Sequence, residues 1–207
     1  GPPLCKLAMN TINATLEAAL AAAVEDHASH RFGQVMFRGA EWCLAHLDPF
    51  AFHRPIDLGS TDGQPTILEV VVLFSCHCFT QGVERDEREA IPANEFYKRD
   101  GETRVLCEER YLLSIDLPAI VFALSTHRIS VAKPGHNFVT FRRQTAAGEK
   151  HYGVFFQVMK ARDRTHRIIL RVQSAYLKEM TKREKTAKNV KLDTLLKAAY
   201  EGRTIRP

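Results

Sequence analysis

The chain has 207 residues, of which 45% are hydrophobic and 26% are charged, and its net charge is +5 with a sequence pI of about 9.0. These values are typical of a soluble globular protein and allow a sizeable core. No apolar run approaches the roughly 20 residues of a membrane-spanning helix, so no membrane partner is expected. The five cysteines are odd in number and irregularly spaced, which argues against a disulfide framework and favours a reducing, cytoplasmic location.

The first third of the chain is predicted to be helical. Residues 11–30 are rich in alanine and predict a helix, with Asn10 or Thr11 as its N-cap. A shorter helix is expected over residues 40–47. Residues 53–66 contain Pro, Gly, Ser and Asp and are predicted to form a loop. We therefore expect an N-terminal helical segment over 1–66 and a core domain over 67–207, together forming one compact domain.

The middle of the chain is predicted to alternate between strand, loop and helix. Residues 67–79 are β-branched and aromatic, which predicts a buried strand, and the polar residues 81–103 predict a long loop or a short exposed helix. Residues 104–115 have a helical pattern, and Asp116 is positioned to cap a second helix.

Three strands are predicted near the C-terminus, over 137–143, 151–160 and 166–176. Their short connections predict an antiparallel meander, and a charged helix over roughly 178–200 closes the chain. The predicted fold class is α+β: N-terminal helices plus an antiparallel β-meander packed on helices, with a basic C-terminal helical tail.

The last predicted strand ends in polar residues. Strict alternation places Ser174 and Tyr176 on the face that carries Ile168, Leu170 and Val172, and Arg171 on the opposite face. A site mouth commonly lies where such an apolar stripe ends. The simpler interpretation is that Tyr176 caps the core and Ser174 bonds to the backbone.

Two further segments carry candidate functional groups. His77, near a strand end, is a candidate general acid or base, although a backbone carbonyl would satisfy it equally well. On a helix, Arg110 would lie beside Ser114 and Tyr111 and could bind phosphate, or it could pair with a nearby carboxylate. The spacing of Cys76 and Cys78 is not that of structural zinc sites, so no metal is predicted.

Positive charge gathers late in the chain, with eleven Lys and Arg between Lys160 and Lys191 opposed by three acidic residues. Such an excess favours a polyanion such as RNA or DNA, whereas the alternative is a solvated helix face. The candidate nucleic-acid-binding residues are Arg142, Arg143, Lys182, Arg183, Lys185 and Lys188. The nucleotide-binding motifs GxxxxGK[ST] and GxGxxG and the catalytic motifs HExxH and GxSxG are absent, and no cofactor is predicted.

The segments 152–156 (YGVFF) and 170–176 (LRVQSAY) resemble the superfamily that groups barnase, EndoU, colicin-type ribonucleases and RelE-type toxins. The resemblance covers about residues 104–176, roughly a third of the chain. It implies metal-independent RNA cleavage by attack of the 2′-OH on the phosphate, and an antitoxin-like inhibitor as a partner. His77 would act as general acid or base, Arg110 and Arg171 would stabilise charge, and Ser174 and Tyr176 would position the phosphate.

Two other function classes remain open from the sequence. A non-catalytic module that binds nucleic acid or protein explains the basic charge equally well and predicts that His77, Arg110, Ser174 and Tyr176 do not converge. A small-molecule enzyme on an α+β scaffold is the third class.

Overall fold

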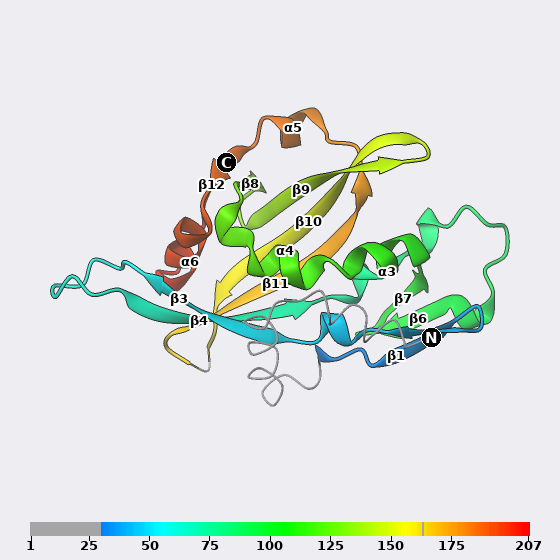
Figure 1. Ribbon diagram of the computed structural model, residues 1–207, viewed down its shortest axis with the longest axis horizontal. Coiled ribbons are helices and arrows are strands. Elements are labelled where there is room, and N and C mark those ends of the chain that lie inside the picture. The colour runs from blue at the N-terminus through cyan, green and yellow to red at the C-terminus, as the bar shows by residue number, and fades with distance from the viewer. Residues whose placement is uncertain (1–29, 163) are drawn as a thin grey trace.

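A computed structural model describes residues 30–162 and 164–207, and this part of the chain is mostly β-structure (Figure 1). The main sheet has seven strands: β3 (Phe50–Ile56), β4 (Thr66–Phe74), β8 (Ile129–Lys133), β9 (His136–Thr145), β10 (Gly148–Lys160), β11 (Arg167–Lys178) and β12 (Lys188–Val190). Their spatial order is β12-β8-β9-β10-β11-β4-β3.

Two smaller sheets complete the β-structure. A three-stranded sheet has the order β5-β7-β6, and β1 and β2 form a separate hairpin. These strands are β1 (Gln34–Phe37), β2 (Ala40–Cys43), β5 (Thr80–Gly82), β6 (Phe96–Arg99) and β7 (Glu102–Leu106).

The helices in the described part of the chain are short. They are α3 (Glu108–Ser114), α4 (Leu117–Phe122), α5 (Lys182–Lys185) and α6 (Leu192–Tyr200). Single 3-10 turns occur at Ala45–Leu47, Cys76–Cys78, Val83–Arg85, Ala93–Glu95 and Leu124–Thr126. None of these helices is both long and apolar enough to cross a bilayer.

β4 joins the two parts of the large sheet. It pairs in parallel with β11 and antiparallel with β3. Strands with a parallel neighbour are usually buried on both faces and have continuous apolar sequences. The run from Val70 to Phe74 fits this rule, because every one of its side chains is buried.

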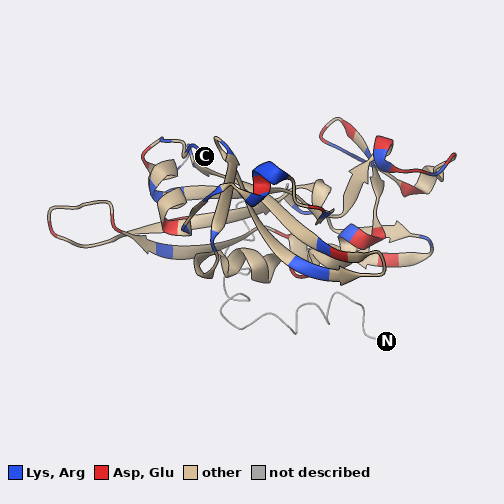
Figure 2. Cartoon of the chain, turned by 90° about the horizontal axis from the view of Figure 1, so that it is seen from above, with Lys and Arg blue, Asp and Glu red and all other residues tan. Residues whose placement is uncertain are grey.

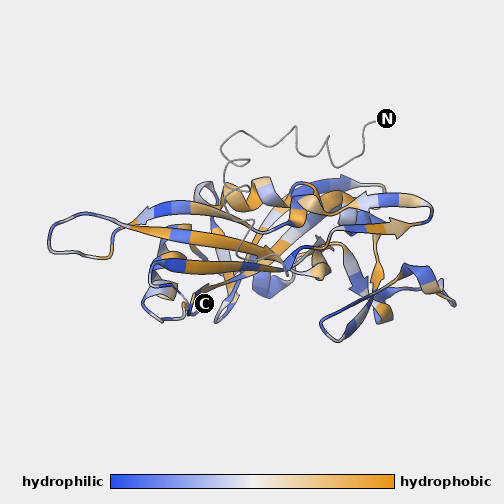
Figure 3. Cartoon of the chain, turned by 90° about the horizontal axis from the view of Figure 1, so that it is seen from below, coloured by the Kyte–Doolittle hydropathy of each residue, from blue (hydrophilic) through white to orange (hydrophobic). Residues whose placement is uncertain are grey.

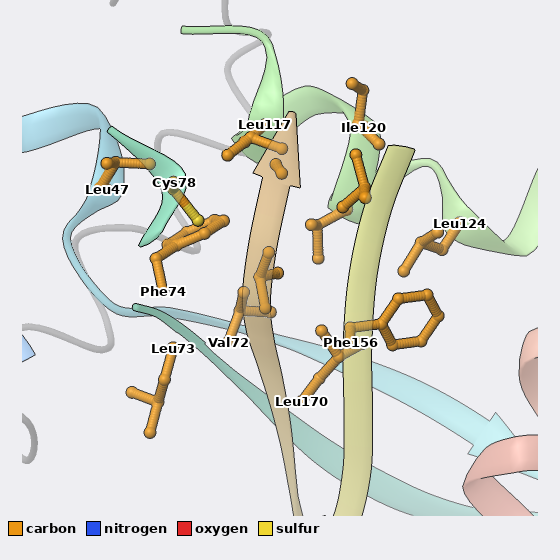
Figure 4. Close-up of a cluster of buried hydrophobic side chains, with 14 of the residues drawn as sticks. Leu47, Val72, Leu73, Phe74, Cys78, Leu117, Ile120, Leu124, Phe156 and Leu170 are labelled. Carbon is orange, nitrogen blue, oxygen red and sulfur yellow. The ribbon is translucent and has the colours of Figure 1, made fainter. Parts of the chain in front are cut away.

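The hydrophobic core lies between the large sheet and the helices that cover it. Figure 4 shows Leu117, Ile120 and Leu124 directed toward Val72 of β4 and Phe156 of β10. α6 contacts β10, β11 and β3. Burial of a leucine or phenylalanine of this kind contributes roughly 1.5–3 kcal/mol. The loops that extend from the ends of the molecule are mainly hydrophilic (Figure 3).

The predicted α+β class is wrong, because strands replace several of the expected helices. Residues 40–47 form β2 and a 3-10 turn. Arg38 and Gly39, with φ of 49° and 78°, form the two-residue turn of the β1–β2 hairpin, as such hairpins require. The Phe37 and Trp42 rings then meet with centroids 4.4 Å apart. The helix expected over residues 11–30 lies outside the described residues.

The basic C-terminal helix expected over 178–200 is also wrong. β11 continues to Lys178, α5 spans only four residues, and Lys188–Val190 pair with β8 at the edge of the large sheet. Residues 102–106 form a strand rather than the first turn of a helix, because β7 pairs with both β5 and β6. Sheet pairing therefore overrides local helical patterns at both places.

The meander of β9, β10 and β11 forms as expected, but a β-bulge changes which residues face the core. Phe155 pairs with Ser174, whereas Phe156 pairs with Val172, so Gln173 is the extra residue on β11. Beyond the bulge Ala175 is fully buried and occupies the core with Val172. Ser174 and Tyr176 consequently leave the core-facing side, and the predicted shared face for Val172, Ser174 and Tyr176 is wrong.

His46 is a buried histidine held within the core by a short hydrogen-bond chain. Its Nε2 donates to Ser114 Oγ at 2.7 Å, and that hydroxyl donates to the carbonyl oxygen of Tyr111 at 2.6 Å. The Tyr111 ring in turn stacks on Trp42, with centroids 4.3 Å apart. Burial lowers the pKa of His46 to about 4, because the core does not solvate an imidazolium.

This burial predicts a loss of stability in acid. The unfolded chain binds a proton at His46 below pH 6.5, whereas the folded chain does so only near pH 4. The free energy of unfolding therefore decreases as the pH is lowered from about 6.5 to about 4. We expect His46→Gln to reduce the loss of unfolding free energy between about pH 7 and about pH 5 by about 2 kcal/mol. Urea unfolding at both pH values measures it. The same pH dependence in His46→Gln and in the exposed control His136→Gln would contradict the assignment.

Candidate functional site

A polar cleft opens where β4 ends and β11 bulges. Its volume is about 760 Å³. It is lined by side chains from the end of β4, the following 3-10 turn, the β6–β7 hairpin and β11: His30, Phe32, Phe74, Ser75, Cys76, His77, Arg99, Asp100, Glu102, Arg171, Gln173 and Ser174. Three of the five predicted catalytic residues, His77, Arg171 and Ser174, therefore lie in one cleft.

His77 lies in the 3-10 turn Cys76–Cys78 rather than in the strand that precedes it. Ser75 begins this turn, and its hydroxyl accepts a hydrogen bond from the backbone N–H of His77 at 3.0 Å. The same hydroxyl donates to the carbonyl oxygen of Gln173 at 2.6 Å. The Ser75 side chain thus connects the 3-10 turn that carries His77 with the β-bulge that directs Ser174 into the cleft.

The His77 imidazole pairs with Glu102, a residue that the sequence analysis did not single out. Nε2 donates to Glu102 Oε2 at 2.8 Å. This hydrogen bond lowers the pKa of the Glu102 carboxyl, so the carboxylate is ionised at neutral pH. Since Nε2 carries the proton toward Glu102, Nδ1 of a neutral His77 is left as the acceptor.

The β6–β7 hairpin places Glu102 beside His77. Arg99 and Glu102 are paired across the hairpin, and Asp100 and Gly101, with φ of 52° and 81°, form its two-residue turn. Asp-Gly is a strong sequence signal for such a turn. The Asp100-Gly101 pair therefore marks a hairpin within residues 81–103, which were expected to form a loop or a short helix. This signal could have identified Arg99, Asp100 and Glu102 as candidate site residues.

Arg171 and Ser174 supply a cation and a hydroxyl to the cleft. Arg171 is exposed and Ser174 is half-buried. Neither side chain has a hydrogen-bond or ion-pair partner within residues 30–162 and 164–207. Both polar groups therefore remain available to an anion, and a guanidinium with a hydroxyl is well suited to phosphate.

Arg110 lies behind the cleft and is committed to the backbone. Its Nη1 donates to the carbonyl oxygens of Thr80 at 2.8 Å and His77 at 3.1 Å. The side chain is 7% exposed, and burial lowers the pKa of its guanidinium. It forms no ion pair with Glu108, Glu109 or Asp116 in the described structure. Arg110 thus holds the turn that carries His77, and it is not among the residues that line the cleft.

Tyr176 contacts Arg110 and does not line the cleft. Its ring stacks on Phe155 with centroids 5.5 Å apart, and the Arg110 guanidinium carbon lies 4.8 Å from the ring centroid. The Phe155 ring in turn covers Gly153, where an added Cβ would lie only 2.9 Å from it. Of the five predicted catalytic residues, Tyr176 and Arg110 therefore form a packed pair beside the cleft.

The predicted nucleic-acid-binding residues lie elsewhere. Arg142 is exposed on β9, and Arg143 approaches Asp116 at 3.6 Å. The basic side chains of α5 are exposed to solvent. Figure 1 places α5 at the top of the view, away from the β6–β7 hairpin that borders the cleft. Lys and Arg are spread over many elements and mixed with Asp and Glu (Figure 2). The structure does not gather these residues around the cleft.

The cysteines near the cleft behave as core residues. Cys78 is fully buried, and burial raises the pKa of its thiol to about 12. Burial also raises the pKa of Cys76. Such thiols stay protonated and unreactive at neutral pH. In the part of the chain that the structure describes, no three His, Cys, Asp or Glu side chains are arranged to hold a metal ion.

These contacts predict that Arg110 matters for stability. Arg110→Ala would leave the buried carbonyls of Thr80 and His77 without their donor, and we expect a loss of about 2–4 kcal/mol in unfolding free energy. Chemical denaturation measures it. Arg85→Ala is the matched control, since Arg85 also lies over the Tyr176 ring, at 5.9 Å, but is 60% exposed. Equal, small losses in both variants would contradict the role of Arg110.

Comparison with curated proteins yields no match, and comparison with solved structures yields none either. A family model described as the YjaZ family matches residues 34–200. The match begins at the first residue of β1 and ends at the last residue of α6, so it includes all of the strands described above. Because it covers most of the chain, this protein belongs to the YjaZ family.

Proposed function

We propose that this protein is an endoribonuclease that cleaves RNA by attack of the ribose 2′-OH on the adjacent phosphate, in the cleft at the end of β11. The observation that carries the proposal is the hydrogen-bonded pair of His77 and Glu102 in the same cleft as Arg171 and Ser174. These groups supply a base, a carboxylate that orients it, a cation and a hydroxyl.

Proton transfer would begin at His77. With Nε2–H donated to Glu102, Nδ1 accepts the proton of the 2′-OH, and the oxygen attacks phosphorus. The P–O5′ bond then breaks, solvent supplies a proton to the departing O5′, and the proton on His77 returns to solvent. The products are a 2′,3′-cyclic phosphate and a 5′-hydroxyl, and every step uses only side chains and water. Glu102 stabilises the imidazolium that forms.

Charge on the phosphorane would be met by Arg171. A guanidinium can bind two phosphate oxygens at once, and the Ser174 hydroxyl can donate to a third. Arg110 would act indirectly, by holding the His77 carbonyl, and Tyr176 would hold Arg110. The roles of direct phosphate contact predicted for Arg110 and Tyr176 are replaced in this proposal by positioning roles.

The expected compartment and partner complete the proposal. Cys76, Cys78 and Cys107 are free thiols, whereas Cys43 is disulfide-bonded, so the cysteines do not by themselves support the reducing cytoplasm expected from the sequence. The cytoplasmic location is kept as part of the proposal. A ribonuclease acting there would threaten cellular RNA unless a protein inhibitor restrained it. The antitoxin-like partner implied by the resemblance is therefore retained as part of the proposal.

The alternative is a nucleic-acid-binding module without catalysis. It is favoured by the basic side chains that lie away from the cleft, on α5 and at Arg142, which is 79% exposed at its side chain. A non-catalytic binder would depend on these cations and would not need His77. The two proposals therefore differ in the variants that they predict to be impaired: changes at His77 for the ribonuclease, and changes in α5 for the binding module.

The catalytic proposal predicts a large effect at His77. His77→Ala should lower the rate of RNA cleavage by about 10²–10⁴-fold, and Glu102→Gln should cause a smaller loss because an amide orients the ring without its charge. Rates are measured with a fluorescent RNA in excess EDTA. His136→Ala, which changes an exposed histidine outside the cleft, is the matched control. Cleavage that survives undiminished in His77→Ala would eliminate the mechanism.

The binding alternative predicts dependence on α5. Replacing Lys182, Arg183 and Lys185 with glutamine should weaken RNA binding. Each lost phosphate contact should make the slope of log K against log salt less steep by about 0.7 for a single strand. Salt titration by fluorescence anisotropy measures it. Replacing Lys98, Arg128 and Lys133 removes the same charge elsewhere. An equal effect of both triple variants would show that net charge, and not α5, governs binding.

A further inference from the structure

A second polar pocket lies away from the cleft, at the start of α6. Its volume is about 650 Å³, and it is lined by residues 125–128, residues 189–194 and Arg54 of β3. Figure 1 places β12 and α6 far from the β6–β7 hairpin that borders the cleft. Small-molecule sites in proteins have volumes of about 300–1,000 Å³, so a pocket of this size can hold an organic ligand.

Two cations meet at this pocket. β12 pairs antiparallel with β8 as far as Val190 and Ile129, so the register places Lys191 opposite Arg128, one residue beyond the last pair. Both residues are exposed and line the pocket. Like charges at opposite positions of an antiparallel pair repel each other. Neither cation has a hydrogen-bond or ion-pair partner within residues 30–162 and 164–207, so no side chain described there relieves this repulsion.

The carboxylate nearest in sequence to Lys191 is committed to another arginine. Arg54 Nε donates to Asp193 Oδ1 at 2.5 Å, and Nη2 donates to Oδ2 at 3.3 Å, so both carboxylate oxygens are engaged. Asp193 is the only acidic residue among the described residues that line the pocket. The pocket therefore has one internally paired arginine and a surplus of two positive charges, at Arg128 and Lys191.

A comparable pair of cations on β9 and β10 does have a carboxylate partner. Arg143 and Lys150 are directly opposite in the register, and Arg143 approaches Asp116 at 3.6 Å. Lys191 is in addition the N-cap of α6, where the helix dipole disfavours a cation. An anion that bridges Arg128 and Lys191 would offset both unfavourable interactions.

We propose that this pocket binds a small molecule that carries a diphosphate group. Two adjacent cations match its two phosphoryl groups, and a guanidinium can bind two phosphate oxygens at once. The hydroxyls of Ser125 and Thr194 line the same pocket and can donate to further oxygens. The remaining volume accommodates the organic part of the ligand. A concave pocket encloses a small molecule, whereas a nucleic-acid strand is bound along a groove.

The test compares pyrophosphate, ADP and inorganic phosphate as ligands of the full chain, by isothermal titration calorimetry at low salt in excess EDTA. We expect pyrophosphate and ADP to bind about 10- to 100-fold more tightly than phosphate, because a single phosphoryl group gives up at least one charge-assisted hydrogen bond. This site does not rest on the proposed ribonuclease activity, so its failure would leave that activity untouched.

The double variant Arg128→Gln with Lys191→Gln should weaken pyrophosphate binding by about 10- to 100-fold. The matched control, Arg143→Gln with Lys150→Gln, removes the same charge from the other cation pair and should leave the affinity unchanged. Urea unfolding checks that both variants are folded.

Three results would overturn the proposal. The first is an intact chain that binds neither pyrophosphate nor ADP, and the second is an equal loss of affinity in the two double variants, which would show that net charge governs binding. The third is single-stranded RNA that displaces pyrophosphate more effectively than ADP does at equal phosphate concentration, which would make the pocket part of an RNA-binding surface.

Discussion

The arrangement around the cleft depends on the hydroxyl of Ser75. It donates to the carbonyl oxygen of Gln173 and accepts from the backbone N–H of His77, so it connects the end of β4 with the bulge of β11. Hydrogen bonds of this kind contribute only about 1 kcal/mol each to stability. Their effect here is geometric, because the bulge directs Ser174 into the cleft and the turn presents His77 to the same space.

The backbone of the His77 turn is held from other directions as well. Thr80 Oγ1 donates to the carbonyl oxygen of Cys76 at 2.7 Å and accepts from Arg104 Nε at 2.8 Å. Arg110 satisfies the carbonyl of His77 itself. Side chains that are bonded and buried in this way lose little freedom when a ligand binds, which is the condition for a preorganised site. The exposed members, Glu102 and Arg171, remain where a ligand can reach them.

Some of the structure could be predicted from the sequence, for identifiable reasons. β9, β10 and β11 are rich in apolar residues and joined by short connections, so this antiparallel meander was predicted correctly. The strand β8 before it was not predicted. The bulge at Gln173 leaves no mark in the residue pattern, and the predicted side of Ser174 was therefore wrong. Glu102 was missed although Asp100-Gly101 signals its hairpin. The basic run after Lys178 appeared helical, but pairing with β8 is a long-range contact that local pattern does not contain.

The central claim is that the cleft cleaves RNA by internal attack of the 2′-OH. Mass spectrometry of the products formed by the intact protein in excess EDTA tests it most directly, because a 2′,3′-cyclic phosphate end is lighter than a linear phosphate end by one water. The account predicts cyclic phosphate ends that accumulate first, with 5′-hydroxyl ends on the other fragments. Linear 3′- or 5′-phosphate ends from the earliest time point, or RNA that stays intact, would contradict it.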